Sequence, residues 1–151
     1  MRTSNKQVYI EPTQASGAAL LSRNPGILKG EVVMLNLLRF RAMADYSDTP
    51  ELAPAHPVTG REAFQKYIEH TLPFLETSGG ELLFLGEGGR YFIGPQDEQW
   101  DAVMLVKQSS LASFMSFAQN GDYLAGMGHR TAAVLDSRLL PIVERPDGKI
   151  L

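Results

Sequence analysis

One polar side chain stands in the most apolar segment of the chain. Residues 31–41 read Glu-Val-Val-Met-Leu-Asn-Leu-Leu-Arg-Phe-Arg, and Asn36 is the amide in the centre of this run. So short and apolar a run is typical of a buried strand, where a polar group without a hydrogen-bond partner costs about 1–3 kcal/mol. We expect Asn36 either to bind a structural partner in a neighbouring loop or to donate to a ligand carbonyl or oxyanion, which is a catalytic role.

Two basic residues, His129 and Arg130, follow each other near the C-terminal end of the chain. Histidine is the side chain best suited to general base catalysis near neutral pH, and an arginine guanidinium can bind a ligand carboxylate with two hydrogen bonds. His129 is therefore a catalytic candidate and Arg130 a ligand-binding candidate. The alternatives are a surface or interface histidine, and an arginine that pairs with Asp136 or another acid.

Three further residues complete the set of ligand-binding candidates. Arg39 lies with Arg41 where the apolar segment ends, so it can attract an anionic ligand or form an ion pair on the rim. Trp100 begins another apolar segment and can line the mouth of a pocket, or serve as a core or interface aromatic residue. Tyr67 falls on the apolar stripe of a predicted helix. Asp101 is an acid that could orient the histidine or the arginine described above.

The histidines do not form a metal-binding pattern. The chain has three, His56, His70 and His129, and no two of them have the spacing of a helical zinc motif. Cysteine is absent, which excludes disulfides and thiolate ligands. Residues 86–90 (Gly-Glu-Gly-Gly-Arg) precede a predicted strand rather than a helix, so they do not match a dinucleotide-binding turn. We predict neither a metal site nor a bound cofactor.

The chain has the size and composition of one globular domain, with 151 residues of which 44% are hydrophobic. Its net charge is −3, and its lysines and arginines do not cluster, which argues against a nucleic-acid partner. No apolar stretch approaches the ~20 residues of a membrane span, and no apolar signal-peptide segment follows the N-terminal residues. We expect a cytoplasmic protein with neither a nucleic-acid nor a membrane partner.

The pattern of apolar residues predicts an α+β fold. The predicted order is strand 31–40, helix 61–77, strand 81–85 interrupted by glycines and resuming at 91–93, strand 100–106, a helix after the cap at 109–110 that ends at 120–121, and strand 137–143. This order is the ferredoxin-like βαββαβ pattern with a four-stranded antiparallel sheet. The single domain 1–151 accordingly comprises an N-terminal extension 1–30, a ferredoxin-like core 31–143 and a tail 144–151.

The first predicted strand is apolar on both faces. Its two alternating sets are Val32, Met34 and Leu38 on one side and Val33, Leu35 and Leu37 on the other. Helices on one side of an antiparallel sheet leave the other side open, and an open apolar face of that size is rare in monomers. We therefore predict a homodimer in which two sheets close face to face into a barrel. Met34→Asp and Leu35→Asp are each expected to destroy folding or solubility.

Three blocks of the sequence resemble a known family. They are residues 33–41 (Val-Met-Leu-Asn-Leu-Leu-Arg-Phe-Arg), 100–106 (Trp-Asp-Ala-Val-Met-Leu-Val) and 128–141 (Gly-His-Arg-Thr-Ala-Ala-Val-Leu-Asp-Ser-Arg-Leu-Leu-Pro). In order and spacing they are similar to the DUF1330 family of the dimeric α/β-barrel superfamily. The resemblance implies a homodimer with a pocket between sheet and helices in each subunit. The wider superfamily includes cofactor-free monooxygenases, muconolactone-type isomerases, dehydratases and haem-binding members, so the fold alone assigns no reaction.

The sequence leaves two functions open. In the first, the protein is a cofactor-independent enzyme of the isomerase, monooxygenase or dehydratase type that acts on a small organic molecule in an apolar barrel pocket. Asn36 and Arg130 would hold the substrate, and His129 would move a proton. In the second, the protein is a non-catalytic dimer that binds a small ligand or another protein and needs no catalytic base. The superfamily analogy favours the enzyme.

Overall fold

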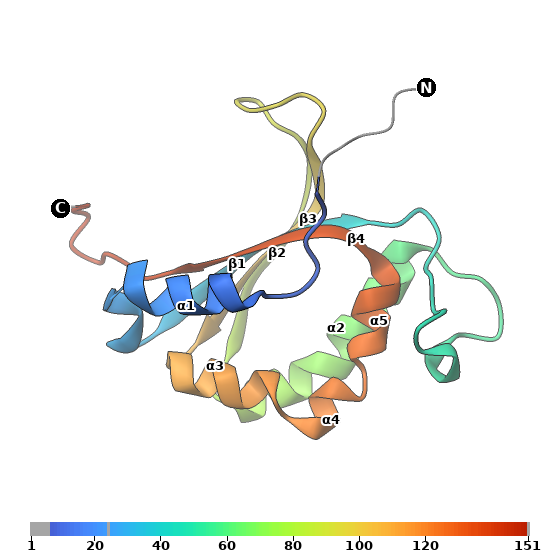
Figure 1. Cartoon of the computed structure of the whole chain (residues 1–151), viewed down its shortest axis with the longest axis horizontal. Helices are drawn as coiled ribbons and strands as arrows, with labels where there is room; N and C mark the ends of the chain where they lie inside the picture. Colours follow the sequence, from blue (N-terminus) through green and yellow to red (C-terminus); the bar gives the residue numbers. More distant parts are fainter. Residues whose placement is uncertain (1–6, 24, 151) are drawn as a thin grey trace.

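A computed structural model describes residues 7–23 and 25–150 of the chain (Figure 1). Its helices are α1 (Gln14–Arg23), α2 (Gly60–Thr77), α3 (Leu111–Ala118), α4 (Gly121–Leu124) and α5 (Met127–Ala133). Its strands are β1 (Val32–Phe40), β2 (Glu81–Arg90), β3 (Gln99–Gln108) and β4 (Val134–Ile142). Two short 3₁₀ helices, η1 (Pro25–Leu28) and η2 (Pro50–Leu52), lie in the connections.

The four strands form one antiparallel sheet in the order β2-β3-β1-β4. Helix α2 connects β1 to β2, a hairpin joins β2 to β3, and α3–α5 connect β3 to β4. This is the ferredoxin-like βαββαβ topology, which confirms the predicted fold class. Strand β4 lies at an edge of the sheet, where the missing N–H of Pro141 is tolerated.

Capping side chains fix where the helices begin. The Thr59 hydroxyl accepts a hydrogen bond from the Glu62 N–H at 3.1 Å, and the Glu62 carboxylate accepts one from the Thr59 N–H at 3.4 Å. This capping box starts α2. Ser110 starts α3 as predicted, because its hydroxyl accepts from the Ser113 N–H at 3.0 Å.

The predicted interruption of the second strand was wrong. Strand β2 runs from Glu81 to Arg90, and its glycines stay paired with β3. A Cβ at Gly88 would lie 2.4 Å from the carbonyl oxygen of Trp100, so the close approach of the two strands requires glycine there. Residues 91–93, predicted as strand, lie in the loop of the hairpin, and the pairing of β2 with β3 shifts register between residues 82 and 84.

Two boundaries in the C-terminal part also differ from the prediction. Asn120 does not end a helix; its side chain accepts hydrogen bonds from the N–H groups of Asp122 and Tyr123 at 2.9 and 3.1 Å and so caps α4. Strand β4 begins at Val134, three residues earlier than predicted, because β1 continues past a bulge and pairs Phe40 with Val134. The earlier start of β4 results from its pairing with β1, a tertiary contact, whereas the Asn120 cap is a local contact that starts a helix instead of ending one.

The helices cover one face of the sheet, and the core lies between them (Figure 1). In β1 the buried side chains Val32, Met34, Asn36 and Leu38 point to this face. The larger core cluster consists of Leu38, Val58, Ala63, Phe64, Tyr67, Ile68, Ala102, Met104, Tyr123, Ala133 and Val134. A smaller cluster joins Ile27, Val32 and Met34, and Leu20 of α1 packs against it. Along β1, Asn36 therefore stands between the two clusters.

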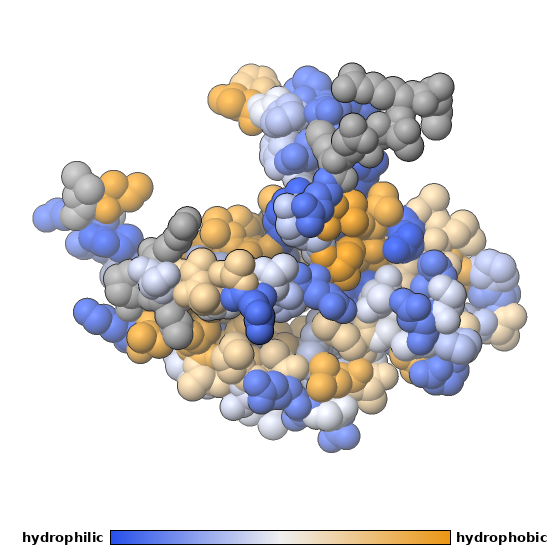
Figure 2. Space-filling model, viewed as in Figure 1, coloured by the Kyte–Doolittle hydropathy of each residue, from blue (hydrophilic) through white to orange (hydrophobic). Residues whose placement is uncertain are grey.

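The opposite face of the sheet is apolar, and no helix of the described residues covers it (Figure 1). The strand register places these apolar side chains side by side on it: Val33, Leu35, Leu37, Phe84, Val103, Leu105, Leu140 and Ile142. The β2–β3 hairpin rises on the same side, and its tip carries Phe92 and Ile93, which are 98% and 88% exposed. Figure 2 shows hydrophobic side chains at this tip and along the upper side of the sheet. We call this surface the open sheet face.

The segment before α1 is bound to β4. The Ser137 N–H donates to the Tyr9 carbonyl at 2.9 Å, and the Tyr9 N–H donates to the Asp136 carboxylate at 2.8 Å. Residues 1–6 and 24 of the predicted N-terminal extension lie outside the described residues. Within the described part of the chain, no helix combines the length and the apolarity that crossing a membrane requires.

Candidate functional site

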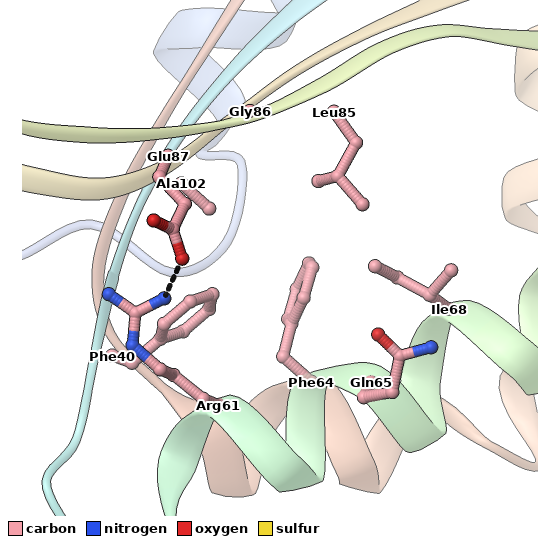
Figure 3. Close-up of a pocket in the computed structure, with 9 residues that line it drawn as sticks. All are labelled: Phe40, Arg61, Phe64, Gln65, Ile68, Leu85, Gly86, Glu87 and Ala102. Carbon is pink, nitrogen blue, oxygen red and sulfur yellow. Dashed lines mark ion pairs between the residues drawn. The ribbon is translucent and has the colours of Figure 1, made fainter.

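A pocket of about 230 Å³ opens between α2 and the edge of the sheet formed by β2 (Figure 3). It is lined by Phe40, Arg61, Phe64, Gln65, Ile68, Leu85, Gly86, Glu87 and Ala102. Phe64 and Ile68 rise from α2 toward Leu85 on the sheet, while Arg61 and Glu87 lie together at one end. The pocket is thus an apolar slot with one charged end.

The spacing of residues along α2 and β2, which form the two walls, explains which side chains line the pocket. Helix α2 contributes residues 61, 64, 65 and 68, which are three and four positions apart and so share one helix face. Strand β2 contributes Leu85 and Glu87, two positions apart and so on one strand face. Their partners on β3 are Met104 and Ala102. Because Ala102 is small, α2 and the sheet leave space between them beside it.

Arg61 is the cation at the charged end. Its Nη1 lies 3.7 Å from Glu87 Oε1, and its Nη2 lies 3.9 Å from Asp101 Oδ1. Its guanidinium carbon also lies 5.6 Å from the centroid of the Phe40 ring, a cation–π distance. Asp101 is fixed in turn, because its Oδ2 accepts the Phe40 N–H at 2.8 Å. Asp101 thus binds Phe40 and Arg61, and the expected contact with His129 or Arg130 is wrong.

None of the six predicted site residues lines this pocket. Asn36 is buried on the helix-covered face of β1, and its Nδ2 donates to the Met34 carbonyl at 3.1 Å. This bond lies within its own strand, whereas the sequence suggested a neighbouring loop. The role of Asn36 as a donor to an oxyanion stays a prediction.

His129 is paired with a tyrosine of the long loop between β1 and α2. The Tyr46 Oη and His129 Nδ1 atoms are 2.8 Å apart, and the two rings meet edge to face at 5.6 Å. Burial lowers the pKa of His129, and the positive charges of Lys66 and His70 lower this pKa further. Burial also raises the pKa of Tyr46. The pair shares one hydrogen bond between the phenol oxygen and the imidazole nitrogen, and the tautomer of His129 sets which of the two is the donor.

Tyr67 contacts a second buried tyrosine instead of the pocket. Its Oη lies 2.8 Å from Tyr123 Oη, which also lies 3.3 Å from Met127 Sδ. Burial raises the pKa of Tyr123 strongly, and the contact with Tyr67 adds to this rise. The charge of Arg130 acts on the same pKa in the opposite direction. Of the predicted residues, Tyr67 therefore contacts the buried Tyr123 hydroxyl, and Arg130 acts on it only through its charge.

Arg130 binds the N-terminal segment. Its Nη1 donates to the Ile10 carbonyl at 3.0 Å, and its Nη2 lies 3.5 Å from Ser137 Oγ. The expected partner Asp136 instead pairs with Arg138 at 2.7 Å. In the described structure Arg130 thus acts as a link between α5, β4 and the segment before α1.

The last two predicted residues lie near the base of the hairpin and the end of β1. Trp100 is buried, and its Nε1 donates to Tyr91 Oη at 2.7 Å. The Arg138 guanidinium carbon lies 5.0 Å from its ring centroid, a cation–π contact. Arg39 lies opposite Asp136 in the β1–β4 ladder, next to the bulge. Ligand binding by Trp100 and Arg39 stays a prediction.

Sequence reasoning missed Arg61, Gln65 and Glu87. A signal was present, since Arg61 and Gln65 flank the apolar stripe of α2 and Glu87 alternates with Leu85. This pattern does not indicate which edge strand of the sheet α2 lies beside. Among the described residues, no group of three histidine, aspartate or glutamate side chains is arranged to hold a metal ion.

The chain is similar to solved structures of RPA0582, a protein of unknown function from Rhodopseudomonas palustris. The methylated RPA0582 protein is 34% identical over 94% of this chain and 98% of its own, with a TM-score of 0.79. A second RPA0582 structure is 33% identical over 93% and 100%, with a TM-score of 0.77. A Bacteroides fragilis protein described as dimeric, with a ferredoxin-like fold and unknown function, is 11% identical over 74% and 94%, with a TM-score of 0.45. No protein-family model and no curated protein matches, so DUF1330 membership stays a prediction.

Proposed function

The chain belongs to the same family as the RPA0582 protein of Rhodopseudomonas palustris, and we propose that it binds a small, largely apolar organic molecule in the pocket between α2 and β2. The observation that carries this proposal is the pocket itself, an apolar slot with the charged pair Arg61 and Glu87 at one end. Ligand sites in proteins have this composition, because apolar walls supply affinity and a few polar groups orient the ligand.

The size of the pocket limits the ligand. Its volume of about 230 Å³ lies below the roughly 300–1,000 Å³ that sites for drug-sized molecules occupy. Phe64, Ile68 and Leu85 approach from two walls, so a flat body fits between them better than a branched one. A molecule with about one ring and one polar group matches both the volume and the distribution of polarity.

We also propose that the protein is a homodimer that buries the open sheet face. This face carries apolar side chains from all four strands, and soluble monomers rarely expose a contiguous apolar patch so large. An isologous pairing would cover the same face on both copies at once. The resemblance to the DUF1330 family supports the same assembly.

A catalytic version of the proposal is favoured by one observation, the bond between Tyr46 and His129. Because Nδ1 of His129 is engaged by Tyr46, the ring is oriented and Nε2 is the nitrogen that would transfer a proton. His129 does not line the pocket, so this version requires substrate to reach the histidine beside Tyr46. A bound ligand that is recovered unchanged after long incubation would refute catalysis, whereas turnover that His129→Gln abolishes would support it.

Native mass spectrometry of gently purified, untagged protein tests the binding proposal. We expect a dimer that carries a defined extra mass, which can then be identified chemically. Leu85→Trp should remove this mass, because the larger side chain fills the pocket from β2, which is an edge strand. Leu83→Trp is the matched control, since Leu83 is about as exposed but does not line the pocket. A protein that binds no mass and shows no pocket shifts in an NMR fragment screen would refute the proposal.

A further inference from the structure

The charged end of the pocket contains a gap between two opposite charges. Arg61 Nη1 and Glu87 Oε1 are 3.7 Å apart (Figure 3), whereas a charge-assisted hydrogen bond is about 2.7–2.9 Å long. The pair thus attracts without a direct hydrogen bond, and a donor and an acceptor face the same opening. An oxygen beside this gap can lie about 2.8 Å from both atoms, which is hydrogen-bond distance.

The two sides of the gap differ in how firmly they are held. Arg61 contacts the Phe40 ring and lies 3.9 Å from Asp101, whose carboxylate is bound to the Phe40 N–H and is 19% exposed. The Arg61 side chain is 55% exposed and the Glu87 side chain is 86% exposed, so water reaches both. The guanidinium is therefore held from the protein side, while the Glu87 carboxylate is free to adjust to a ligand at little cost in stability.

The charges at this end select against ligands that carry a charge. One guanidinium faces the two carboxylates of Glu87 and Asp101. A ligand carboxylate bound to Arg61 would be repelled by both of them, and a ligand ammonium bound to Glu87 would be repelled by Arg61. A neutral hydroxyl avoids both repulsions, since its oxygen accepts from Arg61 and its proton is donated to Glu87.

We propose that the ligand is a neutral molecule whose body is a single apolar ring and whose polar end is a hydroxyl bound between Arg61 and Glu87. The inference rests on the proposed binding function and adds the chemical class and the residues that select it. Phe64, Ile68, Leu85 and Ala102 contact the ring. The ring that carries the hydroxyl is either aromatic or saturated, and the titration with p-cresol and 4-methylcyclohexanol distinguishes these two kinds of ligand.

The test is a ¹H–¹⁵N chemical-shift titration of the full chain at pH 7, followed at the amides of Gly86 and Glu87. The probes are p-cresol, 4-methylcyclohexanol, toluene, benzoate and benzylamine. We expect p-cresol, 4-methylcyclohexanol or both to bind about tenfold tighter than toluene, because hydrogen bonds to charged groups are stronger than neutral ones. A preference between the two alcohols identifies the ring as aromatic or saturated.

Variants at Glu87 show whether the gap is responsible. Glu87→Leu should abolish the advantage of the alcohols over toluene and raise the affinity for benzoate several-fold, because one of the two repelling carboxylates is lost. Glu87→Gln keeps an acceptor in place and should retain much of the preference. Glu81→Leu is the matched control on the same strand, since Glu81 pairs with Lys107 outside the pocket. It should leave all five affinities unchanged.

The outcomes separate this inference from the binding function beneath it. If toluene binds at these amides as tightly as the alcohols, or if the preference survives Glu87→Leu, the inference is overturned and the pocket still binds ligands. Tightest binding of benzoate or benzylamine to the unchanged protein also overturns it. If no probe shifts the pocket amides, the proposed binding function fails as well.

Discussion

Two adjacent residues of β1, Met34 and Leu35, give the sharpest test of the architecture. From the sequence alone, aspartate at either position was expected to destroy folding or solubility. The structure separates them, because Met34 is 2% exposed in the core and Leu35 is half-buried on the open sheet face. Truncating a buried methionine to alanine costs about 2–5 kcal/mol, and a buried unpaired carboxylate costs several kcal/mol more. Since domains are stable by about 5–15 kcal/mol, Met34→Asp should not fold.

Leu35→Asp should behave differently. In a single protomer the carboxylate at position 35 reaches water, so the free energy of unfolding should fall by only about 1–2 kcal/mol, from lost leucine burial and the low strand propensity of aspartate. In the dimer it would be buried against the partner subunit, so the dimer should dissociate. Sedimentation equilibrium over a range of protein concentrations, with far-UV circular dichroism and urea denaturation on the same samples, measures both effects.

We therefore expect a folded monomer from Leu35→Asp and no folded protein from Met34→Asp. Leu124→Asp is the control, because Leu124 is exposed on α4, away from the open sheet face. It should remain a folded dimer. A Leu35→Asp protein that stays dimeric would refute burial of the open sheet face, and one that unfolds like Met34→Asp would refute the assignment of the two strand faces.

Three further variants test the buried polar groups. Burial holds the pKa of Tyr123 above its ordinary value of 10.0, so above pH 10 the unfolded chain releases this proton and the folded chain keeps it. The free energy of unfolding should therefore fall as pH rises above 10. Urea denaturation from pH 8 to 11 should show a shallower fall in Tyr123→Phe than in the unchanged protein, and an equal fall would contradict the reasoning. Burial lowers the pKa of His129, so stability should be lost as pH falls through and below 6.5, less so in His129→Gln, and NMR titration of the imidazole should give a midpoint below 6.5. Arg130→Met removes the bond to the Ile10 carbonyl, worth about 1 kcal/mol, and should speed hydrogen exchange of the Tyr9 amide about fivefold; unchanged exchange would show that Arg130 does not hold this segment.

The fold was predictable because its signals are local and periodic. The apolar run of β1, the helical stripe of α2 and the Ser110 cap are each written in a few neighbouring residues, and their order leaves few topologies open. The errors in β2 and at Asn120 arose where the local signal is ambiguous. Strand β2 continues through its glycines at 86–89 because β3 pairs with it, and an Asn-Gly pair, which often ends a helix, begins α4 instead.

The candidate site was predictable only in part. Alternation along a strand gives Asn36 the same face as Val32, Met34 and Leu38, and only the structure shows that the helices cover this face. The sequence also marked His129 and Arg130 for their chemistry, but not their partners. Tyr46 approaches His129 from 83 positions away, and the Ile10 carbonyl approaches Arg130 from 120 positions away. Separations this long are set by the packing of whole elements.

The sequence by itself therefore determined the α+β class, the order of the elements and the apolar character of both faces of β1, since these follow from hydrophobic periodicity and chain order. Only the tertiary structure decided which residues line the pocket. Arg61 and Glu87 are 3.7 Å apart there, although neither stands in a recognisable motif. They meet because α2 crosses the sheet beside β2, and the angle and depth of that packing depend on the volumes of all the side chains between the two layers.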